Sequence, residues 1–335
     1  MRNGILVGGN WIIDQVKIVD AFPQEEKLVN IISECSSNGG SAYNILKDLA
    51  KLQAGFPLQG IGLVGDDNRG ESIVNECRQL GIDTSQVAKI PSASTSYTDV
   101  MTVISTGKRT FFHQRGANAL LDVEHFDFLL SNAKIFHLGY LLLLDKLDVL
   151  ENEGLTRAAL VLKNALNAGM MTSVDIVSES SDRFNLLIPP ALPFIDYLFV
   201  NEYEAGMITG IKTIDGAEVD VLKCEQAALK LLKMGVRQWA IIHFPAGVLA
   251  VHKEGSKFFQ PSIDVPNELI IGAVGAGDAF AAGVLIGLHN NEGIEKSLRL
   301  GVCAAASSLF ASTSSDGILS TAECLGLSTK YGYRG

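Results

Sequence analysis

The stretch Gly275-Ala276-Gly277-Asp278-Ala279-Phe280-Ala281-Ala282-Gly283-Val284-Leu285 joins two glycines and a carboxylate to an apolar run. The glycines lack the Cβ atoms that would keep a bound group away from the backbone. The apolar residues have helical spacing, so the glycines should lie on the first turn of a helix, where free N–H groups and the helix dipole favour phosphate. Asp278 could then accept a proton during phosphoryl transfer to an alcohol. The alternative is a glycine-rich loop before a core helix, with Asp278 only as a cap.

The composition is that of a globular protein. The chain has 335 residues, 47% hydrophobic and 19% charged, enough for one large α/β domain or two smaller ones. Its net charge of −10 argues against general nucleic-acid binding, which needs a basic surface. Five scattered cysteines without a CxxC pair indicate reduced thiols. Without a signal peptide or a membrane-spanning apolar run, we expect a cytoplasmic protein with no membrane partner.

Short apolar runs alternate with helical patterns along the chain. This alternation predicts a mainly parallel sheet covered by helices on both faces, and no linker divides residues 1–335, so we expect a single domain. The predicted strands are Ile5–Gly9, Gly60–Val64, Ile135–Gly139, Met171–Val177, Tyr197–Val200 and Trp239–His243. The predicted helices are Ala42–Leu52, Glu71–Leu80, Thr156–Asn167, Cys224–Met234, Asp278–His289 and Ile294–Phe310.

Two insertions, at about 12–36 and 95–115, interrupt this pattern. Lys27–Glu34 and Tyr97–Ile104 alternate apolar and polar residues, and Thr110–His113 follows. Strands of this kind suit a small antiparallel sheet with one face in solvent. We interpret the insertions as a lid over a substrate cleft; a decorative hairpin or a dimer contact are the alternatives.

Four polar or glycine-rich segments follow predicted strands or lie close after them. They are Asp14, 39–44, 201–204 and 275–278. Ligands of an open parallel sheet bind beyond the carboxyl ends of its strands. The four segments are therefore expected on one rim of the sheet.

The run Gly60–Gly65 matches the dinucleotide fingerprint GxGxxG, but its context does not fit. The fingerprint needs its glycines in the turn after a strand, whereas the apolar residues here belong to the strand itself. Asp66 and Asp67 follow at once, and their carboxylates would repel a pyrophosphate. We therefore set a nicotinamide-dependent function aside.

Two distant motifs make the chain resemble the ribokinase-like PfkB carbohydrate kinase family. Asn38-Gly39-Gly40-Ser41-Ala42-Tyr43-Asn44 is similar to the N-terminal signature of that family, and Gly275–Phe280 is similar to its C-terminal signature. Weaker similarity lies at 65–70, 107–110 and 201–204. The resemblance implies a three-layer α/β/α sandwich with a β-sheet lid, and an ATP-dependent kinase that uses Mg²⁺.

The resemblance also implies roles for individual residues. Asp278 is expected to be the base, beside an anion hole at Gly275, Ala276 and Gly277. Asn201 and Glu204 are expected to hold Mg²⁺ through water, although Asn201 could equally cap a helix together with Glu204. The expected sugar-binding residues are Asp14, Gly39, Gly40, Ser41, Asn44 and, less specifically, Arg109; the expected nucleotide contacts are Asn201, Glu204, Gly247, Gly275 and Gly277.

The chain departs from the family pattern in two places. The C-terminal signature usually opens with Asp-Thr, where this chain has Gly272-Ala273, so a monovalent-cation site is doubtful. The stretch 242–247 keeps only the final glycine of its usual motif, Gly247, which puts the ribose contacts in doubt.

From these patterns and the resemblance we predict an ATP-dependent sugar kinase that transfers the γ-phosphoryl group of ATP to a hydroxyl of a small carbohydrate. A nucleoside kinase and a non-catalytic sugar-binding regulator on the same fold are the alternatives, since fold alone does not fix function. A homodimer formed through the lid is a further expectation.

Overall fold

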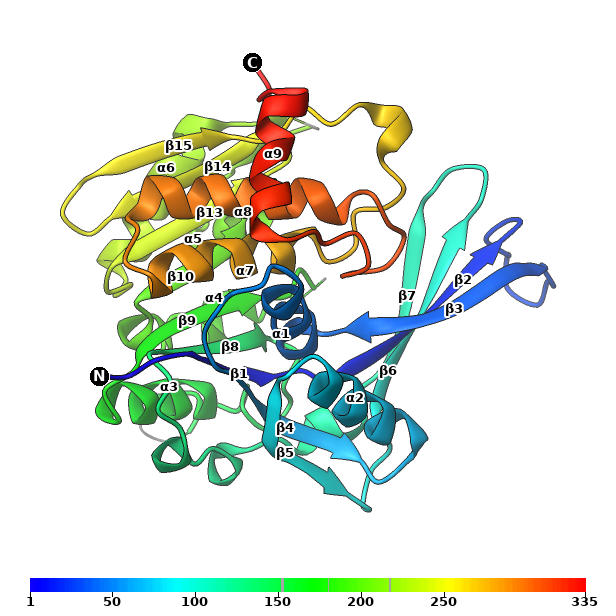
Figure 1. The fold of residues 1–335 in the computed structure, drawn as a ribbon, viewed down its shortest axis with the longest axis horizontal. Coiled ribbons are helices and arrows are strands. Elements are labelled where there is room, and N and C mark those ends of the chain that lie inside the picture. The colour runs from blue at the N-terminus through cyan, green and yellow to red at the C-terminus, as the bar shows by residue number, and fades with distance from the viewer. Residues whose placement is uncertain (152–153, 180, 217) are drawn as a thin grey trace.

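The computed structural model describes residues 1–335 apart from 152–153, 180 and 217. Its main element is a nine-stranded sheet in the order β15-β14-β13-β10-β9-β8-β1-β4-β5 (Figure 1). Seven strands are parallel: β1 (Ile5–Gly9), β4 (Leu58–Gly65), β5 (Asp83–Ile90), β8 (Ile135–Leu141), β9 (Met171–Ile176), β10 (Tyr197–Asn201) and β13 (Trp239–Phe244). At one edge, β14 (Gly247–His252) and β15 (Lys257–Pro261) run antiparallel.

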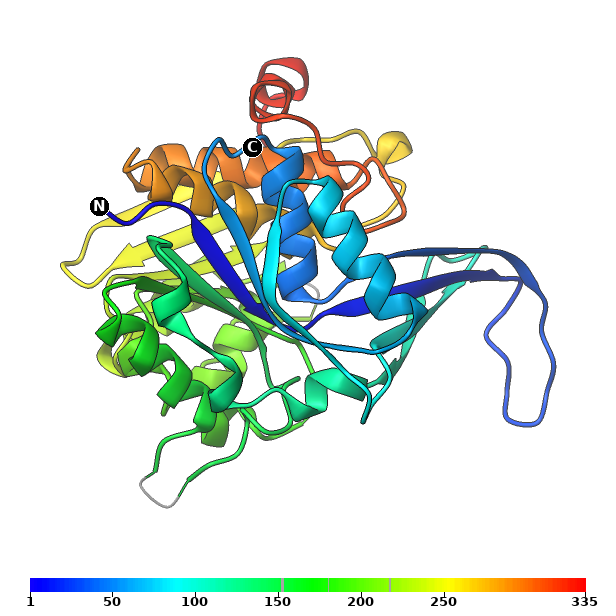
Figure 2. The same cartoon turned by 60° about the horizontal axis from the view of Figure 1, so that its bottom comes forward.

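Helices cover both faces of this sheet (Figures 1 and 2). One apolar core lies under α1 (Ser41–Lys51), α2 (Asn68–Gln79), α7 (Ala276–His289), α8 (Ile294–Ser308) and α9 (Thr321–Tyr331). The other lies under α3 (Arg157–Asn167), α4 (Phe184–Leu187), α5 (Glu202–Thr209) and α6 (Val221–Lys233). In β1, Ile5 and Val7 belong to the first core and Leu6 to the second, because successive side chains of a strand point to opposite faces. The predicted three-layer α/β/α fold is therefore confirmed.

The predicted strands and helices of the main layer match observed elements to within two residues at each end. The exceptions are α2 and α6, which each start three residues before the predicted position. Missing from the prediction were β5, whose polar and apolar residues alternate at a sheet edge, the β14–β15 hairpin, and the helices α4 and α9. The remaining elements are the pair β11 (Ile214–Asp215) and β12 (Glu218–Val219), and 3-10 turns at Gly116–Leu120, Val123–His125, Phe128–Leu130, Leu192–Phe194 and Asn267–Leu269. No described helix has the length and apolar character needed to cross a membrane.

A second sheet projects from the carboxyl-end side of the main sheet, and we call it the lid (Figure 1). Its order is β3-β2-β6-β7, with β2 at Ile12–Val19, β3 at Ile31–Gly39, β6 at Ser96–Val103 and β7 at Arg109–Gln114. The predicted small antiparallel sheet is present except for one strand pair. β2 and β6 both run outward from the main layer and pair in parallel, while β2–β3 and β6–β7 are antiparallel.

The strand bounds of the lid also need correction. β2 was not predicted as a strand, and the strand expected at Lys27–Glu34 instead runs from Ile31 to Gly39. Asn30 closes the loop before it by donating from Nδ2 to Asp20 at 2.9 Å, so regular pairing starts only at Ile31. The extra length of β3 carries the chain back from the tip of the lid to the start of α1.

Candidate active site

The first turn of α7 forms one wall of the site. Gly275 precedes the helix with φ of 76°, and a Cβ atom there would lie 2.7 Å from the Ser314 backbone oxygen, so the position requires glycine. The first helical hydrogen bond runs from Ala279 N to Gly275 O (2.8 Å). The N–H groups of Ala276, Gly277 and Asp278 come before it and therefore face outward from the helix end, as an anion site requires.

Asp278 lies on this turn with its carboxylate buried. Asn44 Nδ2 donates to Oδ2 at 2.8 Å, and the Tyr140 hydroxyl lies 2.9 Å from Oδ1 and 2.7 Å from Oδ2. Burial and the nearby charge of Asp175 raise the pKa of Asp278 to about 8, against the opposing effect of the two hydrogen bonds. The structure thus places Asn44 directly on the predicted base.

A buried polar network lies behind Asp278, and it includes Ser41. The Ser41 hydroxyl donates to Asp175 Oδ2 at 2.9 Å and lies 3.3 Å from His137 Nε2. His137 Nδ1 is 2.8 Å from Ser173 Oγ, which ties β8 to β9. Ser41 is fully buried, so its side chain supports the site from behind.

Tyr140 and Asp175 were not among the predicted site residues. Both lie near the carboxyl ends of strands that the sequence did predict, β8 and β9. Their position at the carboxyl ends of parallel strands is the signal that could have marked them, since ligands bind at that rim.

The glycine pair Gly39-Gly40 brings the lid against α1. A Cβ atom at Gly39 would lie 2.4 Å from Asp14 Oδ1, and one at Gly40, where φ is 79°, would lie 2.7 Å from Asn10 O. Asp14 lies within β2 of the lid rather than at the end of a main-sheet strand. Burial raises the pKa of Asp14 to about 7, and a hydrogen bond with Thr98 opposes this shift. The charge of Asp14 also raises the pKa of Asp278, so the two carboxylates are near enough to influence each other.

Arg109 is farther from this group than the sequence suggested. Asp14 shares a row of the lid with Ser37, Thr98 and His113, whereas Arg109 pairs with Thr102. Arg109 lies four positions from His113 along β7, which corresponds to about 13 Å of strand. Because side chains alternate between the two faces, Arg109 is on the same face as Asp14 but in the second row outward on that face.

Asn201 and Glu204 stand opposite the α7 turn. Asn201 Oδ1 accepts from Glu204 N at 2.8 Å, and Glu204 Oε2 accepts from Asn201 N at 2.9 Å, so the pair forms a capping box at the start of α5. Ser178 Oγ also donates to Glu204 Oε1 at 2.7 Å. Burial raises the pKa of Glu204 to about 7. Asn201 and Glu204 therefore do cap the helix, which is the alternative that the sequence analysis gave for this pair.

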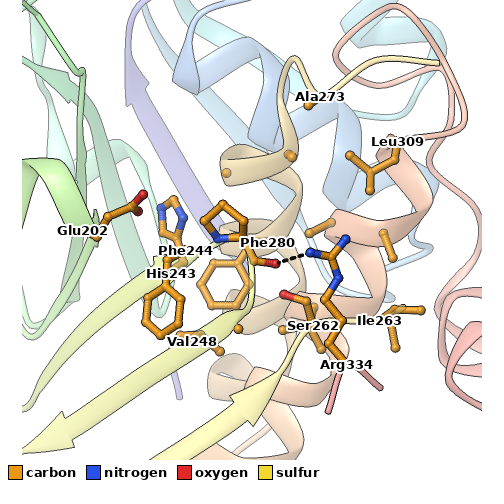
Figure 3. A pocket seen from close by; sticks show the side chains of 17 residues that line it. Glu202, His243, Phe244, Val248, Ser262, Ile263, Ala273, Phe280, Leu309 and Arg334 are labelled. Carbon is orange, nitrogen blue, oxygen red and sulfur yellow. Dashed lines mark hydrogen bonds between the residues drawn. The ribbon is translucent and has the colours of Figure 1, made fainter. Parts of the chain in front are cut away.

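A cavity of about 240 Å³ lies between these walls. Asp278 and the α7 turn line one side, Asn201 and Glu204 the other, and Tyr140, Asp175 and His243 complete it. A second cavity, of about 410 Å³, adjoins it and shares His243, Ala273, Ala276 and Gly277 (Figure 3). The two cavities can hold the charged and the apolar parts of one extended ligand.

The larger cavity is mainly apolar. Its walls include Phe244, Val248, Ile263 and Phe280, together with Gly247 at the start of β14 and small residues of α8. Arg334 lies at its edge and donates from Nη1 to Pro245 O at 3.3 Å (Figure 3). Burial lowers the pKa of His243 to about 4, so this histidine is neutral at physiological pH. Arg334, near the end of the chain, carried no motif that could have marked it in advance.

The loop before α7 carries no carboxylate at Gly272 or Ala273. A Cβ atom at Gly272 would lie 2.8 Å from Ala311 O, so the loops pack too closely there for a larger side chain. The carboxylate of Asp316 is largely exposed, 3.9 Å from Lys47 Nζ. Lys51 Nζ donates to the backbone oxygens of Ser315 (2.7 Å) and Asp316 (3.0 Å).

Comparisons with known proteins agree with this geometry. Arabidopsis thaliana adenosine kinase 1 is 24% identical, over 90% of this chain and 93% of its own length. An ATP-dependent ribose-1-phosphate kinase from Halopiger xanaduensis is 27% identical, over 86% and 85%. The solved structure of Giardia lamblia ribokinase aligns with a TM-score of 0.79 at 20% identity, covering 96% of this chain and 98% of that one. The model of the pfkB family carbohydrate kinase matches residues 3–321, and the chain therefore belongs to this kinase family.

Proposed function

We propose that Asp278 accepts the proton of a sugar hydroxyl while the γ-phosphoryl group of ATP is transferred to that oxygen. The observation that carries this proposal is the position of Asp278. Its carboxylate lines a cavity whose wall is the α7 N-terminus and whose neighbour is a larger apolar cavity. Base, anion site and nucleoside-sized space are thus contiguous, as phosphoryl transfer from a nucleotide requires.

The proposed reaction exchanges one bond to phosphorus for another and needs one proton acceptor, Asp278. The acceptor oxygen forms a bond to the γ-phosphorus, the bond to the β–γ bridging oxygen breaks, and the acceptor proton moves to Asp278. The N–H groups of Ala276, Gly277 and Asp278 stabilise the negative charge on the phosphoryl oxygens. A lid closed over the cleft excludes water, which would otherwise compete as the acceptor.

The nucleoside of ATP is assigned to the larger cavity. Its apolar walls suit a purine ring, and Gly247 lines the cavity at the start of β14. Gly277 and His243 belong to both cavities and mark the passage from nucleoside to phosphates.

Magnesium fits beside the phosphates through its water shell. Within the described residues, no three His, Cys, Asp or Glu side chains come together as direct ligands, and Asn201 and Glu204 are already engaged in their capping box. Both still line the phosphate cavity, and Mg²⁺ commonly keeps several waters. Bound there, the ion would neutralise phosphate charge, while Asn201 and Glu204 would orient its waters.

The acceptor is assigned to the region between Asp14 of the lid and Asp278 of α7. Asp14 can accept hydrogen bonds from two sugar hydroxyls, and Gly39 and Gly40 allow close approach of the backbone. One observation favours a nucleoside as second candidate: the next row outward on the same lid face, Cys35–Val16–Val100–Phe111, is largely apolar and suits a base attached to the sugar. Arg109, one row beyond, could reach back toward such a substrate.

A coupled ADP-release assay tests these proposals. The acceptors are ribose, fructose, a keto-deoxy sugar acid, adenosine and inosine, each with and without Mg²⁺. ADP release that depends on an acceptor supports the kinase, and the preferred acceptor separates sugar from nucleoside. Calorimetric binding of an acceptor without any ADP release would instead support the non-catalytic regulator.

We also propose that two lids associate in a homodimer in the cytoplasm. Large apolar side chains on the lid are about half exposed, among them Ile31, Ile32, Phe111 and Phe112. Sedimentation velocity of the wild type and of Ile32→Glu tests this, since a dimer formed through the lid should dissociate in the variant. The five cysteines are free thiols, which is consistent with a reducing compartment.

A further inference from the structure

The Tyr140 hydroxyl lies between the two carboxylate oxygens of Asp278, 2.9 Å from Oδ1 and 2.7 Å from Oδ2. Tyr140 is the residue before the last in β8, and it lines the cavity that we assign to the phosphates. Neither the PfkB-like motifs nor the composition of the chain pointed to it. Its hydroxyl nevertheless makes the closest contacts to the proposed base.

The backbone holds Tyr140 in this position. Its N–H group donates to Asn10 Oδ1, and Asn10 Nδ2 donates to Leu143 O at 3.1 Å. Asn10 is fully buried between β1 and β2, so the loop that leads into the lid also fixes the tyrosine. The backbone of Tyr140 is therefore fixed in β8, and its side chain contacts Asp278 from a rigid strand.

The hydrogen bonds divide the two oxygens of Asp278 into different environments. A carboxylate offers about four lone-pair positions. Oδ2 accepts from Asn44 and is the nearer oxygen to the single Tyr140 proton, at 2.7 Å, whereas Oδ1 shares that proton at 2.9 Å and has no second donor among the described hydrogen bonds. We infer that Tyr140 is a positioning residue that favours the ionised form of Asp278 and leaves a lone pair of Oδ1 available to receive the acceptor proton. This inference rests on the proposed function of Asp278.

The charges around Asp278 explain why such a residue is needed. The carboxylates of Asp14 in β2 and Asp175 in β9 raise the pKa of Asp278, and Asp278 in turn raises the pKa of Asp48 in α1. Glu204 of α5 and neutral His243 of β13 line the same cavity. Burial and Asp175 raise the pKa of Asp278, and the donors Asn44 and Tyr140 oppose them. Burial also raises the pKa of Tyr140 well above its ordinary value, so its hydroxyl remains a donor.

The substitution Tyr140→Phe removes the hydroxyl and keeps the ring. Tyr197→Phe is the matched control, because the Tyr197 hydroxyl contacts only Met171 Sδ, at 3.3 Å, among the described hydrogen bonds and lies at the opposite end of β10 from the site. Both variants are first checked for an unchanged thermal unfolding transition, and pH profiles of kcat and of kcat/KM for the acceptor are then recorded.

We expect the acid limb of the Tyr140→Phe profile to move up by about one pH unit, which costs about tenfold in rate below the limb. Above the limb, kcat should return to within about threefold of the wild type, because the base is then ionised without the tyrosine. The Tyr197→Phe profile should be that of the wild type. A Tyr140→Phe profile lowered equally at every pH would overturn the inference, since it would show a structural role only.

A measurement without turnover separates this inference from the proposed function. The ¹³C signal of the Asp278 carboxyl, assigned by its loss in Asp278→Asn, is titrated in the wild type and in Tyr140→Phe. An upward shift of its midpoint in a protein that releases no ADP would support the role of Tyr140 and overturn the assigned reaction. An unchanged midpoint in an active kinase would overturn the role of Tyr140 and leave the reaction standing.

Discussion

Asn44 Nδ2 donates to Asp278 Oδ2 at 2.8 Å, which joins the first turn of α1 to the first turn of α7 across 234 residues of sequence. Asn38 Nδ2 in turn donates to Asn44 Oδ1 at 2.6 Å and to Ser315 Oγ at 2.8 Å. The two sequence signatures thus meet through side chains, and their separate residues act as one site.

Asp278→Asn should fold normally and lose nearly all kinase turnover. An amide cannot accept the proton, and general-base assistance is worth about 10²–10⁴ in rate. Steady-state kinetics with the preferred acceptor would measure the loss. A variant that keeps more than about a tenth of the wild-type kcat would show that Asp278 is not the base.

Asp14→Ala should weaken acceptor binding and leave nucleotide binding nearly intact. Each lost hydrogen bond to a charged group costs about 1.5–3 kcal/mol, so the acceptor KM should rise at least about tenfold. Calorimetric titration with the acceptor and with a non-hydrolysable ATP analogue would test this. Equal loss of affinity for both ligands would contradict the assignment.

Gly39→Ala should give a similar acceptor defect without removing any polar group. Its Cβ atom would lie 2.4 Å from Asp14 Oδ1 and must displace that carboxylate, so the acceptor KM should rise by about tenfold. Gly326→Ala in α9 is the control, because a Cβ atom there meets no atom within 4 Å. An unchanged KM in Gly39→Ala would mean that the position of Asp14 does not matter for binding.

The contribution of Asp14, Glu204 and Asp278 to stability should fall as the pH rises from about 4 to 8. The folded-state pKa values of Asp14 (about 7), Glu204 (about 7) and Asp278 (about 8) lie above those of unfolded chains, so the folded protein binds more protons in this range. Urea unfolding at pH 5 and pH 8 measures the difference. Asp278→Asn should raise the free energy of unfolding more at pH 8 than at pH 5; the opposite order would refute the raised pKa.

Activation by potassium should be weak or absent. Gly272 supplies no carboxylate, and Asp316, which could have replaced it, is directed toward Lys47 and solvent. One charge at about 4 Å in a partly buried site is worth about 4 kcal/mol before desolvation, so its loss should weaken cation binding. Initial rates in potassium chloride and in tetramethylammonium chloride at equal ionic strength provide the comparison. A several-fold, potassium-specific rise in kcat would contradict this expectation.

The sequence predicted the main layer well because buried parallel strands and amphipathic helices carry strong apolar patterns. It predicted the lid poorly, since pairing between β2 and β6 depends on two segments 84 positions apart that leave the main sheet in the same direction. In the site, glycine motifs marked the α7 turn and the Gly39-Gly40 pair. Tyr140 and Asp175 lie in strands whose apolar pattern hides single polar residues, and only the fold shows that they meet Asp278.

The lid strands β2 and β3 are joined by very short connections to β1 and α1 of the main domain. Two residues separate the end of β1 at Gly9 from the start of β2 at Ile12, and Gly40 alone lies between β3 and α1. Any swing of the lid therefore turns about these short joints and carries Asp14 toward or away from Asn44 and Asp278. If the acceptor binds Asp14 as proposed, its binding would also hold the lid closed, and phosphoryl transfer would then require the acceptor to be in place.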